Sequence, residues 1–251
     1  MALTTIGLMA LLGCFTGFMA GLLGIGGGMI ITPFLIMLIP SSLIPHEHIV
    51  HVAIATSLAT IAFTSLSSVR AHHKRGAVLW NVVASVAPGI LVGAVVGAQI
   101  AGWLPTFWLS LIFAAFVGFS AFKMFLNKSP RPDRNLPGTI GKFFMGIAIG
   151  ILSALVGAGG GFISVPWMIW CNVKMQNAVA TSAAFGFPIA LFGTIGYIIS
   201  GWNVSGLPPW PIDLGYICIP ALFSVAITSV LFAPLGAKVA HSIDTKPLKK
   251  I

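Results

Sequence analysis

Apolar runs of about 20 residues alternate with short polar segments along this 251-residue chain. A membrane-spanning helix needs about 20 predominantly apolar residues, so each long run predicts one crossing. The long runs occupy residues 4–22, 51–69, 77–102, 106–126, 139–157, 177–200 and 213–237. Two shorter runs, at 29–39 and 162–172, fall short of a ~30 Å bilayer core at ~1.5 Å rise per residue. The pattern predicts an all-α polytopic membrane protein that contains two half-helices.

Each short run follows a glycine cluster, and the two clusters match. GLLGIGGGMIITPF at 21–34 returns as SALVGAGGGFISVPW at 153–167, and AIATS at 53–57 returns as AVATS at 178–182. Two motifs that recur in the same order indicate an internal duplication, in which each half supplies one broken helix to a shared centre. The predicted parts are a first repeat of four helical segments at 1–105, a connecting transmembrane helix at 106–126, a cytoplasmic linker at 127–138 and a second repeat at 139–251.

The composition agrees with a membrane protein, because 57% of residues are hydrophobic and only 7% are charged. The net charge of +9 comes from basic residues that gather in three regions. These are Arg70, Lys74 and Arg75; Lys123, Lys128, Arg131, Arg134 and Lys142; and Lys238, Lys246, Lys249 and Lys250. The loops at 40–50, 103–105 and 201–212 have no Lys or Arg. The positive-inside rule makes the three basic regions, with the C-terminus, cytoplasmic. One membrane face, rather than a nucleic-acid surface, explains this distribution.

The charge pattern also sets the direction of the two repeats. Between Lys142 and Lys174 the chain must return to the same side of the membrane. It does so if 139–157 and 162–172 form a down-and-back pair hinged at the glycines. The same logic in the first half places the N-terminus outside. We therefore expect two inverted-topology repeats, each with a broken, re-entrant helix at its glycine motif.

The glycine clusters are the first candidate binding site. Irregular backbone at membrane depth survives only inside protein or beside a water-filled cavity. Exposed amides and positive dipole ends at the half-helix N-termini would form an anion site without a buried Lys or Arg. The candidate substrate-binding glycines are Gly26, Gly27, Gly28, Gly159, Gly160 and Gly161. The alternative is that these glycines only permit close helix packing.

The repeated ATS motif supplies the second set of candidates, Thr56, Ser57, Thr181 and Ser182. Their hydroxyls could reach an anionic oxygen or a carbonyl freed by the broken helix. The alternative is that they bond their own helix or join neighbouring helices.

Other residues predict packing and interfaces. Small-residue spacing at Gly13, Gly17 and Gly21, and at Gly89, Gly93 and Gly97, predicts close helix contacts. Prolines inside long apolar runs predict kinks at Pro88, Pro188, Pro220 and Pro234. We expect His46, His48 and His51 to form a polar cluster at the outer edge, and His72 and His73 to be loop residues.

Enzyme chemistry is not expected. The four acidic residues, Glu47, Asp133, Asp213 and Asp244, lie near segment ends or in loops, which disfavours a proton relay at mid-membrane. No GxSxG motif occurs, and HEH at 46–48 lacks the HExxH spacing of a zinc site. The sequence therefore predicts neither a catalytic residue, nor a metal site, nor a cofactor.

The glycine motifs at 24–33 and 157–166 and the ATS motifs are accompanied by GAQIA at 97–101 and GAKVA at 236–240. Together these segments resemble the TauE/SafE family of sulfite exporters over nearly the whole chain. The resemblance implies a multi-pass inner-membrane protein that exports small sulfur-containing organic or inorganic anions, and it supports the glycine, threonine and serine candidates as signature positions. Gln99 departs from the basic residue expected after Gly-Ala, while Lys238 keeps it.

The sequence thus predicts a secondary transporter that moves a small anion across the lipid bilayer by alternating access. Sulfite, thiosulfate, a sulfonate and an organic acid all remain open as substrates, as do the coupling ion, the direction of transport and the oligomeric state, a homodimer included. Two rival functions are a passive anion channel and a non-transporting scaffold or assembly protein.

Overall fold

The computed structural model describes residues 3–24, 26–40, 43–125, 135–208 and 212–242. Most of the predicted linker at 127–138 lies outside the described residues. So do the tail lysines Lys246, Lys249 and Lys250.

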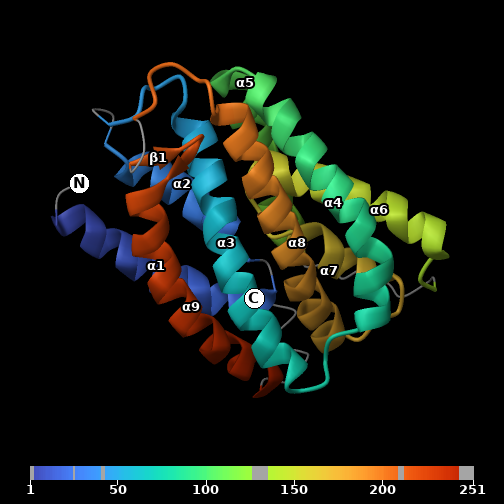
Figure 1. The fold of residues 1–251 in the computed structure, drawn as a ribbon. Helices are drawn as coiled ribbons and strands as arrows, with labels where there is room; N and C mark the ends of the chain where they lie inside the picture. The colour runs from blue at the N-terminus through green and yellow to red at the C-terminus, as the bar shows by residue number, and fades with distance from the viewer. Residues whose placement is uncertain (1–2, 25, 41–42, 126–134, 209–211, 243–251) are drawn as a thin grey trace.

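The chain folds into long helices with two short ones between them (Figure 1). The elements are α1 (Leu3–Leu23), α2 (Gly28–Leu38), α3 (Ile49–His73), α4 (Trp80–Trp103), α5 (Thr106–Phe125), α6 (Thr139–Val156), α7 (Gly161–Trp170), α8 (Met175–Gly201), β1 (Asp213–Leu214), β2 (Ile217–Cys218) and α9 (Ile219–Ser242). Among the described residues, six helices are long and apolar enough to cross a membrane: α1, α3, α4, α6, α8 and α9. These helices match six of the predicted crossings. The seventh, 106–126, forms the 20-residue helix α5, whose residues Thr106–Phe122 are a shorter apolar stretch.

Helices α2 and α7 are the predicted half-helices. They have 11 and 10 residues, so each extends only ~15 Å along its axis. Neither reaches across a ~30 Å hydrocarbon core. Each begins directly after a glycine cluster, which confirms that the glycines break an apolar segment in both halves.

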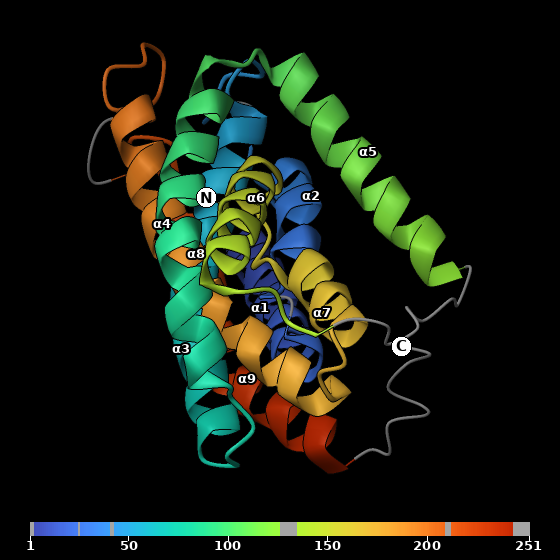
Figure 2. The ribbon, with the colours of Figure 1, turned by 90° about the vertical axis from the view of Figure 1, so that its right-hand side faces the viewer.

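The two halves pack around a central pair of helices. Helices α3 and α8 contact each other at the centre, α1 packs on α9 at one side, and α4 packs on α6 at the other (Figures 1 and 2). Equivalent helices α3 and α8 run in opposite directions, α3 downward and α8 upward in Figure 1. Each outer pair joins a helix from one repeat to a helix from the other. The fold is therefore that of two inverted repeats, and α5, which connects them in sequence, lies along one edge of the bundle (Figure 2).

Glycines allow the outer pairs to approach closely. A Cβ atom added to Gly17 of α1 would lie 2.6 Å from the Cα of Ser229 in α9. A Cβ atom added to Gly97 of α4 would lie 2.9 Å from the Cα of Ile151 in α6. Without side chains at these positions the backbones come into contact, which confirms the predicted packing strips.

The last predicted crossing begins later than the sequence suggested. Residues 213–218 form the β1–β2 hairpin, which turns at Gly215 (φ 59°), and α9 then runs from Ile219 to Ser242. Asp213 and the glycine turn favour the hairpin over helix. The kink predicted at Pro220 was therefore wrong, since this residue occupies the first turn of α9, where a missing N–H has no cost. Pro88, Pro188 and Pro234 do lie inside helices.

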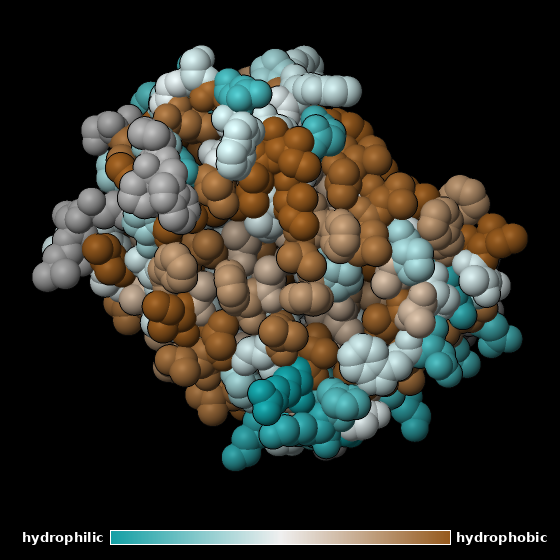
Figure 3. Space-filling view, viewed as in Figure 1, coloured by the Kyte–Doolittle hydropathy of each residue, from teal (hydrophilic) through white to brown (hydrophobic). Residues whose placement is uncertain are grey.

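The surface matches a chain embedded in lipid. Apolar side chains cover the middle of the face in Figure 3, and polar ones gather at its lower end, where α3 and α9 finish. Large apolar residues such as Met37, Trp103 and Phe107 are mostly exposed, as lipid-facing side chains are.

Candidate functional site

Glycine backbone geometry builds both helix breaks. In the first break Gly24, Gly26 and Gly27 have φ values of 68°, 75° and 75°. In the second, Gly157 and Gly160 have φ values of 67° and 77°. These values lie in the left-handed region that side chains with a Cβ atom rarely adopt. Gly27 and Gly160 are the N-cap residues of α2 and α7, so these glycine turns set the direction in which each half-helix begins.

The two breaks meet inside the protein. A Cβ atom added to Gly26 would lie 2.9 Å from the Cα of Gly159. One added to Gly28 would collide with the carbonyl oxygen of Gly157. Gly26–Gly28 and Gly157–Gly161 are all buried. The breaks, 133 residues apart in the matched sequences at Gly24 and Gly157, therefore converge on one place, as the inverted topology predicted.

Each serine of the ATS motifs contacts a backbone carbonyl in the helix break of the opposite repeat. The Ser57 hydroxyl in α3 lies 3.2 Å from the carbonyl oxygens of both Gly28 and Gly157. The Ser182 hydroxyl in α8 donates to the carbonyl of Gly24 at 3.0 Å and accepts from Ser164 at 2.8 Å. The carbonyls of Gly24 and Gly157 lie where the chain turns out of its helix, so the serines satisfy groups that the breaks free, while Gly28 already belongs to α2.

The two threonines bind the starts of helices instead. The Thr56 hydroxyl oxygen accepts the amide of Cys218, just before α9, at 3.0 Å. The Thr181 hydroxyl oxygen accepts the amide of Leu79, the N-cap residue of α4, also at 3.0 Å. Each threonine thus contacts a helix of the other repeat. Binding of an anion by these hydroxyls, or by those of Ser57 and Ser182, stays a prediction.

The half-helix N-termini offer hydrogen-bond donors. No side chain among the described residues caps α2 or α7. The amides of Ile30 and Ile163 donate to the carbonyls of the N-cap residues Gly27 and Gly160 at 3.1 Å, while the two residues before each of them have no acceptor within the helix for their amides. Two hydroxyls missed by the sequence analysis lie beside these turns. Ser153 Oγ is 3.3 Å from a Cβ position built at Gly160, and Thr32 Oγ1 is 3.0 Å from one built at Gly157.

Both hydroxyls are buried and have no hydrogen-bond partner among the described residues. The sequence did carry a sign of them, since Ser153 lies four residues before Gly157 and Thr32 four residues after Gly28. That spacing places each hydroxyl one helical turn from a break. No charged residue occurs at 24–38 or 157–170, so the centre offers neutral donors and helix dipoles.

His72 and His73 were predicted to be loop residues, which is wrong, because both lie in the last turn of α3. His72 is buried, with Nε2 3.1 Å from the carbonyl oxygen of Gly21 and Nδ1 2.9 Å from Nε2 of His241. Tyr197, the matching residue of α8, donates to the carbonyl of Ala154 at 3.1 Å. Each side chain therefore hydrogen-bonds a central helix to the last turn of the helix that precedes a glycine break. His72 was missed because its partners are distant in sequence.

A polar cluster lies at the opposite end, as predicted for the outer histidines. His51 Nε2 lies 3.0 Å from the carbonyl oxygens of Ala101 and Leu104 at the end of α4, and its ring stacks on Tyr216 at 5.0 Å. In the adjoining hairpin, burial raises the pKa of the Asp213 carboxyl to about 7 and that of the Cys218 thiol to about 12. Burial also raises the pKa of Tyr216. This cluster lies at the end of the bundle opposite His72 and His241.

Inverted repeats whose half-helices start at a shared buried centre define a polytopic membrane transporter fold. The family model described as "Sulfite exporter TauE/SafE" matches residues 9–251. The chain belongs to this family.

Curated relatives support the transporter class. The chain is 34% identical to a "Probable membrane transporter protein" of Haemophilus influenzae, covering 98% of this chain and 93% of the relative. It is 28% identical to a probable membrane transporter protein of Methanocaldococcus jannaschii over 96% of this chain and 89% of the relative. A Bacillus subtilis protein of the same description is 30% identical, with 74% and 76% coverage. No solved structure gives a significant match.

Proposed function

We propose that the chain is a secondary transporter that exports small sulfur-containing anions across the inner membrane by alternating access. Sulfite, thiosulfate, sulfonates and similar organic anions are the proposed substrate class. The observation that carries this proposal is the meeting of two uncapped half-helix N-termini at one buried place. Helix N-termini bind oxyanions through backbone amides and dipoles.

In the proposed bound state, first-turn amides of α2 and α7 donate to the anion's oxygens. The unpartnered hydroxyls of Ser153 and Thr32 supply further donors from the adjoining turns. The centre contains no fixed cation that would hold an anion too tightly for release. Neutral donors also avoid the desolvation cost of a buried Lys or Arg.

The proposed movement is rocking of the two repeats about the central helices α3 and α8. Burial of all the glycine turns favours this mechanism over a passive channel, since an open pore would expose its binding groups to water. By the positive-inside rule the basic end, with the C-terminus, faces the cytoplasm and the N-terminus lies outside. One chain completes this cycle, and a homodimer is no part of the proposal.

The proposal is tested by efflux of radiolabelled sulfite and thiosulfate from vesicles that contain the purified chain. Gly27→Leu and Gly160→Leu are expected to abolish saturable efflux, because each places a side chain at a positive φ beside the site. Gly118→Leu is the matched control, since a Cβ atom there meets nothing within 4 Å. Wild-type rates in both site variants would contradict the proposal.

A milder variant separates binding from folding. Ser153→Ala removes an unpartnered hydroxyl, so the folded chain should be as stable as wild type or more so. The KM for the anion should nevertheless rise several-fold. Flux without saturation or counterflow would identify a channel instead. A chain that binds none of these anions but captures a partner protein would identify a scaffold.

A further inference from the structure

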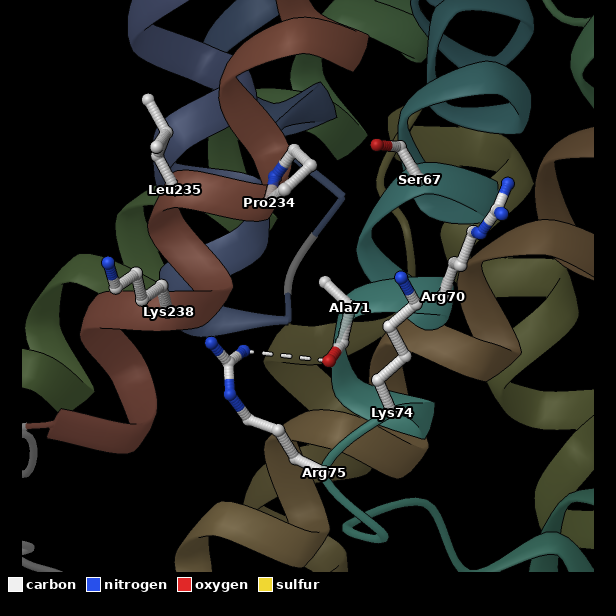
Figure 4. Close-up of a pocket in the computed structure, with 8 residues that line it drawn as sticks. All are labelled: Ser67, Arg70, Ala71, Lys74, Arg75, Pro234, Leu235 and Lys238. Atoms are coloured by element: carbon white, nitrogen blue, oxygen red, sulfur yellow. Dashed lines mark hydrogen bonds between the residues drawn. The ribbon is translucent and has the colours of Figure 1, made fainter.

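A pocket of about 490 Å³ opens on the side of the molecule between α3 and α9, at the basic end (Figure 4). Arg70 and Lys74 line it from the end of α3, Arg75 from the turn that follows, and Lys238 from α9. Pro234 and Leu235 of α9 line it nearer the middle of the molecule. Since α3 and α9 belong to different repeats, the pocket spans the contact between them.

The four cations of this pocket have no carboxylate partner among the described residues. The one ion pair among the described residues joins Glu47 to His48, just before the opposite end of α3. In Figure 4 the Arg75 side chain turns back towards α9, and its guanidinium donates to the carbonyl of Ala71 at 3.5 Å. All four side chains are exposed, so water weakens their mutual repulsion, and an anion bound among them would reduce it further.

The other repeat shows that helix packing does not require these cations. The matched pair Thr56 and Thr181 aligns α3 with α8. In this alignment Arg70, Lys74 and Arg75 correspond to Ile195, Ile199 and Ser200. Lys238 in GAKVA corresponds to Gln99 in GAQIA. Helices α8 and α4 pack together as α3 and α9 do, yet their groove carries no charge. Because helix packing does not require them, the cations indicate a ligand that is present only at the basic end.

The surface beyond the cations is apolar. Leu235 and Leu231, one turn apart on α9, are 51% and 66% exposed. Phe63 and Leu66 of α3 are 51% and 58% exposed. These side chains occupy the membrane-facing part of the same two helices. A ligand that matches both regions has an anionic head and apolar chains, which a free inorganic oxyanion does not have.

The pocket also adjoins Pro234, a proline inside α9 whose missing hydrogen bond is replaced from the other repeat. Pro234 has no N–H to donate to the carbonyl of Val230, and the Ser67 hydroxyl of α3 donates to that carbonyl at 2.9 Å. A head group bound by cations of α3 and α9 would join the two helices beside this proline.

We propose that this pocket binds the phosphate head group of an anionic phospholipid, with the acyl chains lying along α3 and α9. Basic pockets between membrane helices recognise such head groups by charge. The site is separate from the glycine centre, so it does not depend on which anion the chain transports.

The test is native mass spectrometry of the full chain in detergent, with phosphatidylglycerol or phosphatidylcholine of identical acyl chains added. Wild type should retain phosphatidylglycerol in preference to phosphatidylcholine. The double variant Arg75→Gln with Lys238→Gln should bind phosphatidylglycerol about ten-fold more weakly or worse. The control is Lys142→Gln with Lys174→Gln, which removes the same charge outside the pocket and should change binding less than about two-fold.

Three outcomes would overturn the proposal. Equal binding of the two lipids would show that the head-group charge is not recognised. Equal losses in the two double variants would show that only the net charge matters. Complete displacement of phosphatidylglycerol by millimolar inorganic phosphate would identify a site for a free oxyanion. All four substituted side chains are exposed or half-buried, and unchanged thermal unfolding without added lipid would show that the variants fold.

Discussion

The hydroxyl of Ser182 donates a hydrogen bond at 3.0 Å to the carbonyl of Gly24, 158 residues earlier in the chain. Its counterpart Ser57 lies 3.2 Å from the carbonyl of Gly157, the residue that matches Gly24. Each central helix therefore satisfies the backbone of the other repeat's break. The broken helices depend on the contact between repeats, which links the stability of the fold to the geometry of the centre.

Removing these serine hydroxyls should destabilise the fold. Ser57→Ala and Ser182→Ala each leave a buried carbonyl without its partner, at a cost of about 1 kcal/mol. Thermal unfolding in detergent should show a lower midpoint for each variant and a lower one still for the pair. Ser85→Ala is the control, because that hydroxyl bonds only its own helix, through the carbonyl of Asn81 at 2.7 Å. Equal midpoints in all the variants would refute the cross-repeat role.

The two threonines should act on different helices. Thr56→Val removes the acceptor of the Cys218 amide and should speed hydrogen exchange at the start of α9. Thr181→Val should do the same at the start of α4, where it frees the Leu79 amide. Each change should cost about 1 kcal/mol of stability, and serine at either position should restore it. The prediction fails if exchange rises at both helix starts in either variant.

Asp213 should make stability depend on pH. Burial raises its pKa from 3.8 to about 7, so between these values the folded chain keeps a proton that the unfolded chain loses. The Asp213 contribution to stability is therefore complete below pH ~4, falls as pH rises, and is lost above pH ~7.

Asp213→Asn removes this dependence. Between pH 5 and pH 8, the unfolding midpoint of wild type should fall by more than that of the variant. Parallel changes in the two proteins would show that the Asp213 carboxyl titrates alike in the folded and unfolded chains.

Much of the fold was predictable from sequence because lipid restricts the choices. A chain in hydrocarbon must satisfy its backbone within helices, so apolar length alone located α1, α3, α4, α6 and α8. The two glycine clusters located the half-helices α2 and α7, and the one-sided basic residues gave the inversion. The hairpin before α9 was missed because hydropathy does not detect a turn at Gly215.

The candidate site was predictable only in part. Glycine and hydroxyl types at matched positions named Gly26, Gly159, Ser57 and Ser182, but sequence could not pair a hydroxyl with a carbonyl 100 or more residues away. His72 shows the same limit, since its contacts with Gly21 and His241 exist only in the folded chain.

By itself, the sequence determined the helices, the two breaks and the inverted order of the repeats, because these follow from apolar length, glycine conformation and charge sidedness. Tertiary structure alone decided that Thr56 and Thr181 bind helix starts while Ser57 and Ser182 bind the breaks. It also left the hydroxyls of Ser153 and Thr32, beside the glycine turns, without a partner in the part of the chain that the structure describes. The reason is physical: a hydroxyl bonds whichever polar group packing brings within about 3 Å, and packing joins residues from opposite halves of the chain.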